Sequence, residues 1–111
     1  MRRVAAGLRR DGRYDPVLCA YLSVTPPSIE QVIDRLVRGG AGDIRVLPYF
    51  VLTGKHVSRH IPAIVRAARK KYRGVAKISL CPYLGYHDKL VSVVKQRIGE
   101  ARHQGIGGQA R

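Results

Sequence analysis

Apolar residues follow two alternating patterns along the chain. Three near-continuous apolar runs of strand length cover residues 17–24, 44–52 and 75–83. Between and after them, apolar residues recur every three or four positions over residues 29–37, 61–72 and 90–101, which is typical of helices that bury one face. One further short helix is expected over residues 3–10. Apolar strands that alternate with amphipathic helices predict an α/β fold with a short parallel sheet of three strands.

Helix start and stop signals set the expected boundaries. Ser28 and Gln31 have the spacing of a capping box, and Pro27 suits the start of a helix. Pro62 lacks a backbone donor, so the next helix is expected to begin at about His60, or to carry the proline in its first turn. Residues 1–104 are interpreted as a single domain and residues 105–111 as a flexible tail.

Length and composition exclude several classes of protein. A chain of 111 residues with 45% hydrophobic residues is a single domain with enough apolar material for a core, which argues against disorder. Two cysteines exclude a disulfide-rich secreted scaffold. No apolar run is long enough to span a bilayer or to serve as a signal peptide. These features predict a cytoplasmic protein that does not act at a membrane.

The chain is strongly basic, with 21 Lys and Arg against 7 Asp and Glu and a net charge of +14. Such a field attracts polyanions. From charge alone, a nucleic acid, an anionic membrane surface and a polycarboxylate small molecule fit equally well. The densest run of cations, residues 66–73, also fits a solvated helix face whose cations complement the helix dipole.

Polar residues follow the predicted strands at the edge where open α/β sheets bind ligands. His56 comes soon after the second run and His87 after the third. A neutral imidazole binds borderline metals and takes up a proton near pH 7, whereas a loop histidine can also simply cap a helix. That second reading is favoured for His87. If residues 58–62 are helical, His56 and His60 share a helix face at a spacing that can chelate a metal.

Neither cysteine carries a clear chemical signal. Cys19 and Cys81 lie inside predicted strands, where small buried hydrophobic residues are expected rather than metal or redox sites. Glycine-rich phosphate loops and Ser-His-Asp or Cys-His sets are not recognisable from spacing.

Four strings that occur in one order carry a resemblance to a known family. They are AYLSVTPPSI (20–29), VLPYFVLTGKHV (46–57), IP (61–62) and PYLGYH (82–87). Over residues 15–101 the chain resembles the CbiX-type sirohydrochlorin cobaltochelatases and the related ferrochelatases. The resemblance implies a three-layer chelatase-like α/β fold with helices on both faces of the sheet. It also implies an enzyme that inserts a divalent metal into sirohydrochlorin, on the way to cobalamin or sirohaem.

The resemblance also implies roles for particular residues. The histidine of the family's Gly-x-His-Val motif falls on His56, which would bind the incoming metal and help to remove pyrrole protons. Lys55 and Arg59 flank it and would bind the carboxylates of the substrate. His60 replaces a family aspartate and would supply a second nitrogen ligand. Ser23 stands where the family often has glutamate.

One departure from the family concerns the sheet itself. The family usually opens with a strand that ends in His-Gly-Ser-Arg, and this strand and motif are absent here. We therefore expect a domain that is incomplete at its N-terminus relative to the family, with the three strands matching the family's second, third and fourth.

The expected substrates and partners follow from the same resemblance. The metal is a substrate, with cobalt expected and iron or nickel as alternatives, and no organic cofactor is implied. The other partner is a sirohydrochlorin-type tetrapyrrole, and a homodimer or pairing with another subunit is expected. Two alternatives stay open. The first is a truncated, non-catalytic relative that binds tetrapyrrole or metal, and the second, which is less favoured, is a basic nucleic-acid-binding domain.

Overall fold

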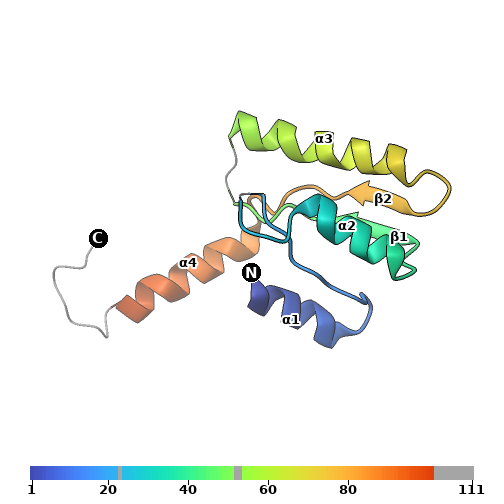
Figure 1. The fold of residues 1–111 in the computed structure, drawn as a ribbon. Coiled ribbons are helices and arrows are strands. Elements are labelled where there is room, and N and C mark those ends of the chain that lie inside the picture. The colour runs from blue at the N-terminus through green and yellow to red at the C-terminus, as the bar shows by residue number, and fades with distance from the viewer. Residues whose placement is uncertain (23, 52–53, 102–111) are drawn as a thin grey trace.

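The computed structural model describes residues 1–22, 24–51 and 54–101. The elements, in chain order, are α1 (Arg2–Asp11), α2 (Ile29–Arg38), β1 (Asp43–Val46), α3 (Lys55–Lys71), β2 (Lys77–Leu80) and α4 (Asp88–Ala101) (Figure 1). The tail predicted for residues 105–111 lies outside the described residues.

The sheet contains β1 and β2, which pair in parallel with Ile44 opposite Ile78. Helix α3 connects the two strands and lies along one side of them, whereas α1 lies on the side away from α3 (Figure 1). The predicted α/β class and the parallel sheet are therefore confirmed.

The sheet has two strands where the sequence predicted three. Over residues 17–22, the first apolar run forms only an isolated bridge between Tyr21 and Ser28, and the Tyr21 amide donates to the Pro27 carbonyl at 3.0 Å. These residues pair with their own following turn instead of with β1. A regular strand requires a continuous ladder of hydrogen bonds to a neighbour, so apolar composition alone did not produce one.

The two regular strands are also shorter than the predicted apolar runs and end earlier, at Val46 and Leu80, because Pro48 and Pro82 cannot donate to a ladder. The segments nevertheless continue side by side past these prolines. The amides of Cys81, Leu84 and Gly85 donate to carbonyls of residues 46, 48 and 50 at 2.8, 3.0 and 2.8 Å. This pairing carries the chain beyond the sheet into the region where a ligand would bind.

One prediction about α3 was wrong, because the helix begins at Lys55 rather than near His60 and therefore contains Pro62 in its interior. Pro62 cannot donate to the carbonyl four residues earlier, which normally destabilises a helix. The first turn forms nonetheless, and the Ser58 amide donates to the Gly54 carbonyl at 2.9 Å. The neighbouring Ile61 is only 5% exposed. Burial of this side chain in the core offsets the lost backbone hydrogen bond.

The core lies where α2, α3 and the inner face of the strands meet. It consists of seven buried apolar residues: Ile29, Ile33, Ile44, Ile61, Val65, Ala68 and Ile78. Because strand side chains alternate between faces, the opposite face of the pair presents Arg45 and Ser79 instead. Helix α4 extends away from this core and has no buried residue (Figure 1). No helix in the described part of the chain is long and apolar enough to cross a membrane.

Both ends of α2 are fixed by polar contacts. The predicted capping box is confirmed, because the Gln31 amide donates to Ser28 Oγ at 3.1 Å and the Ser28 amide donates to Gln31 Oε1 at 2.8 Å. Near the other end, the Tyr72 hydroxyl donates to Asp34 Oδ1 at 2.6 Å, and Arg38 Nε lies 2.8 Å from Asp34 Oδ2. The hydrogen bond from Tyr72, with Arg38 and Lys71 nearby, lowers the pKa of Asp34. This contact joins α2 to the end of α3.

We expect Tyr72→Phe to lower the free energy of unfolding at pH 7, and to do so less at acidic pH. A carboxyl whose pKa is lowered by folding stabilises the fold above its unfolded pKa, and this contribution disappears as pH falls through the folded pKa. The difference between variant and wild type should therefore shrink below about pH 4. Urea unfolding at several pH values measures it, with Tyr14→Phe on an exposed tyrosine as control. A difference that does not change with pH would contradict the role of Asp34.

Candidate functional site

A hollow of about 180 Å³ lies at the carboxyl ends of both strands, beside the start of α3. Open α/β sheets bind their ligands at this edge, as the sequence predicted. Its lining residues are Pro48, Phe50, Ser58, Ile61, Pro62, Leu80, Cys81, Pro82 and Tyr83. The lining is mostly apolar, so it suits the flat face of an organic ring better than a free ion.

A single glycine lets the loop after β2 close against the rest of this hollow. Gly85 is buried and has a φ of +56°, a conformation that side-chain-bearing residues rarely adopt. A Cβ at this position would also lie 3.3 Å from the Tyr83 ring. The Gly85 amide donates to the Phe50 carbonyl at 2.8 Å. The two strand extensions, which contribute Phe50 and Tyr83 to the lining of the hollow, are therefore held together at this point.

The four residues predicted for metal and substrate binding all lie in the first turns of α3. The side chains of Lys55 and His56 lie outside what the structure describes, and those of Arg59 and His60 are exposed. Since the helix is continuous from Lys55, His56 and His60 stand one turn apart on the same side of it. Residues 58–62 are helical, which was the condition for His56 and His60 to share a helix face. The binding roles of these residues stay predictions.

His87 has the capping function that the sequence favoured. The Lys89 amide donates to His87 Nδ1 at 3.1 Å, and the Leu90 amide donates to the His87 carbonyl at 2.8 Å. The Tyr86 hydroxyl donates to Asp88 Oδ1 at 2.8 Å, and this hydrogen bond raises the pKa of Tyr86. Residues 86–88 therefore stabilise the start of α4 through these hydrogen bonds.

The cysteines are free thiols, but the prediction that they lie buried inside strands was wrong, because both are only partly buried and lie outside β1 and β2. Cys81 lines the hollow together with Phe50, and neither residue was predicted from the sequence as part of the site. Pro48 and Pro82 could have indicated these two residues, because they follow the ends of the regular strands at the edge where ligands bind. No group of three or more His, Cys, Asp or Glu side chains comes together among the described residues.

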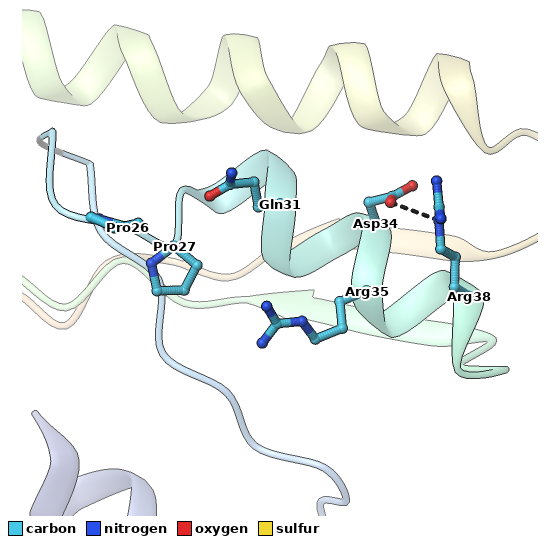
Figure 2. A pocket seen from close by; sticks show the side chains of 6 residues that line it. All are labelled: Pro26, Pro27, Gln31, Asp34, Arg35 and Arg38. Carbon is cyan, nitrogen blue, oxygen red and sulfur yellow. Dashed lines mark ion pairs between the residues drawn. The ribbon is translucent and has the colours of Figure 1, made fainter.

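A second, wider hollow of about 680 Å³ runs along α2 (Figure 2). It is lined by Pro26, Pro27, Gln31, Asp34, Arg35 and Arg38. Most of its polar groups already have structural tasks, since Gln31 caps the helix and Asp34 is bound by Tyr72 and Arg38. It also lies along the helix rather than at the strand ends. We therefore assign the candidate site to the smaller hollow beside α3.

Comparison with known proteins gives matches to a single family. The family model described as CbiX matches residues 1–101. The chain is 30% identical over 87 residues to a sirohydrochlorin cobaltochelatase from Priestia megaterium, covering 78% of this chain and 28% of that protein. It is 33% identical over 85 residues to a chloroplastic sirohydrochlorin ferrochelatase from Arabidopsis thaliana, covering 77% and 37%.

A third relative is closer in size. A sirohydrochlorin cobaltochelatase from Sulfolobus acidocaldarius is 27% identical over 81 residues, which cover 73% of this chain and 63% of that protein. The chain thus spans between 28% and 63% of the length of these curated relatives.

The fold has a counterpart among solved structures. The crystal structure of a cobalamin (vitamin B12) biosynthesis CbiX protein from Marinobacter aquaeolei superposes with a TM-score of 0.72 at 20% identity, covering 93% of this chain and 86% of that one. At this identity the match supports the fold alone.

Proposed function

Because the chain belongs to the CbiX family, we propose that it binds a sirohydrochlorin-type tetrapyrrole and inserts a divalent metal ion, cobalt or iron, into the ring. The observation that carries the proposal is the position of His56, in the first turn of α3 beside the hollow at the strand ends. A mostly apolar hollow would hold the ring face, and the adjacent helix start would deliver the metal to it.

The proposed reaction exchanges two protons for one metal ion. The ring loses the protons of two pyrrole nitrogens as the metal binds to its four nitrogens, so charge is conserved. His56 receives the metal through a neutral imidazole nitrogen, and His60, one turn further along α3, supplies a second nitrogen. A metal-bound imidazole has no lone pair left for a proton. The two pyrrole protons therefore leave to water or to a further base.

Two cations would hold the carboxylates at the rim of the substrate. Lys55 and Arg59 flank His56 in the first turns of α3, and no acidic residue stands beside them in this part of the chain. Each contact to an exposed carboxylate is weak and is screened by salt. Their combined contribution would thus depend strongly on ionic strength.

We expect charge reversal at both positions, Lys55→Glu with Arg59→Glu, to raise the substrate dissociation constant about fivefold or more at low salt. The effect should fade as ionic strength approaches 1 M, where the screening length is about 3 Å. Titration of sirohydrochlorin at two salt concentrations measures it. Arg2→Glu with Arg3→Glu on α1 makes the same change in net charge away from the site. Equal losses in both double variants would contradict a local role for Lys55 and Arg59.

The test of the proposed activity is spectroscopic. Mixing the chain with sirohydrochlorin should shift the Soret band, and addition of Co²⁺ or Fe²⁺ should then produce the metallated spectrum faster than in a sample without protein. A shift without faster metallation would favour the alternative of a non-catalytic tetrapyrrole-binding relative. The absence of any shift would refute both proposals.

We also propose that two copies assemble through α4. Three apolar side chains at helical spacing, Val91, Val94 and Ile98, are 44%, 55% and 66% exposed. A second copy would remove this apolar surface from water. Sedimentation equilibrium should give twice the mass of the chain, and a monomer at all concentrations would contradict the proposal.

A further inference from the structure

The exposed side of α3 carries a concentration of positive charge near the end of the helix. We define the α3 basic face as Arg66, Arg69, Lys70 and Arg73, all of which are exposed. The first three lie on α3, which turns Ile61, Val65 and Ala68 toward the core, and Arg73 lies in the turn that follows. In Figure 1 no other element lies beyond α3 on this side of the molecule.

No acidic side chain balances this charge. Residues 44–87 contain no Asp or Glu. All four ion pairs of the described chain use cations elsewhere, joining Arg13 to Asp11, Arg38 to Asp34, Arg45 to Asp43 and Arg97 to Glu100. Lys71, which is not part of the α3 basic face, lies 5.3 Å from the Tyr72 ring. The positive field over the α3 basic face is therefore not neutralised within the described residues.

The helix dipole accounts for only part of the α3 basic face, and the proposed metal site accounts for none of it. The dipole favours cations within the last turn, which includes Arg69 and Lys70, whereas Arg66 precedes that turn and Arg73 follows it. The site lies at the first turn of α3, while the basic face lies toward the other end of this 17-residue helix. At a rise of about 1.5 Å per residue, His56 and Arg66 are about 15 Å apart along the axis. Neither explanation therefore applies to Arg66 and Arg73.

We propose that the α3 basic face binds the phosphate backbone of a nucleic acid. Three of its four cations are arginines, whose planar guanidinium groups match phosphate oxygens in a two-pronged geometry. From Arg66 to Lys70 the face spans about 6 Å of helix axis, and Arg73 extends it into the turn that follows. Duplex DNA presents one phosphate per about 1.7 Å of its own axis, so several phosphates come within reach of the four cations. Contacts to phosphates carry no sequence information, so the binding should be independent of base sequence.

The surroundings of the face favour nucleic acid over an anionic membrane. Helices that bind membrane surfaces pair their cations with large apolar side chains that enter the lipid. Within the α3 basic face the exposed residue between the cations of the helix is Ala67, and the larger apolar side chain nearby is Val75, which follows the helix and is 65% exposed. One alanine and one valine give too little apolar surface to anchor a helix in a bilayer, so an ionic contact with a stiff, highly charged backbone fits better.

The experiment measures binding of the 111-residue chain to a fluorescent 20-base-pair duplex by anisotropy at several salt concentrations. Four phosphate contacts predict that log K falls with log salt with a slope of about −3.6. Arg66→Gln with Arg69→Gln removes two contacts, which should make the slope about 2 units shallower and weaken binding at least about tenfold at 0.1 M salt. Both substitutions keep residues that favour a helix.

The matched control separates a local surface from net charge. Arg2→Gln with Arg3→Gln on α1 removes the same charge from another exposed place, and its affinity should change by less than about twofold. An equal loss in the control, or unchanged binding in the α3 variant, overturns the proposal. Tighter binding to phosphatidylserine vesicles than to the duplex at equal salt also overturns it, in favour of a membrane. Chelatase activity plays no part in the readout, so failure of the proposed enzymatic function would leave this test intact.

Discussion

Substitution of His56 by alanine is expected to abolish insertion of Co²⁺ or Fe²⁺ into sirohydrochlorin while the fold stays intact. The loss should be at least about hundredfold in rate, the scale of losing a positioned side chain that handles metal or protons. The fold should tolerate the change because alanine favours a helix more than histidine does. His56 lies in the first turn of α3, and the Ser58 amide still closes that turn on the Gly54 carbonyl.

Two further histidine variants make this result specific. His87→Ala removes a residue that caps α4, and we expect it to keep the wild-type insertion rate. His60→Ala should fall between the two, because it would remove only the second nitrogen ligand. Rates are read from the metallated tetrapyrrole spectrum, and far-ultraviolet circular dichroism checks the fold. A wild-type rate in His56→Ala would refute the assignment of this residue.

The second large effect concerns stability rather than chemistry. Ile33→Ala should lower the free energy of unfolding by about 2–5 kcal/mol. Ile33 is 2% exposed and belongs to the cluster that joins α2, α3 and both strands. Domains of ordinary stability have only about 5–15 kcal/mol in total, and this core has seven buried members. A large fraction of the variant should therefore unfold at moderate urea concentrations.

A matched substitution tests whether the loss comes from the core. Val93→Ala removes apolar atoms from α4, where the side chain is 44% exposed, and should change the free energy of unfolding by less than about 0.5 kcal/mol. Urea titrations followed by circular dichroism give both values. Similar losses in the two variants would show that α4 is buried in solution, and a small loss in Ile33→Ala would contradict the described core.

The helices of this protein were largely determined by local sequence. Ser28 and Gln31 specify the start of α2 because a capping box needs only residues three positions apart. The periodic apolar residues of α3 and α4 likewise depend on neighbours within a turn or two. His87 was correctly assigned to the start of α4 for the same reason, since its acceptor atom serves the amide of Lys89.

What the sequence did not determine depends on partners that are distant along the chain. Residues 17–22 are as apolar as a strand, but a strand exists only through hydrogen bonds to another strand, and here the Tyr21 amide binds its own turn. Pro62 predicted a later start for α3, and burial of Ile61 in the core outweighed that local signal. The helical start at Lys55 in turn aligns His56 with His60. Net charge was visible in the composition, but only the fold, which turns one side of α3 toward the core, gathers four cations on an exposed face without acidic neighbours.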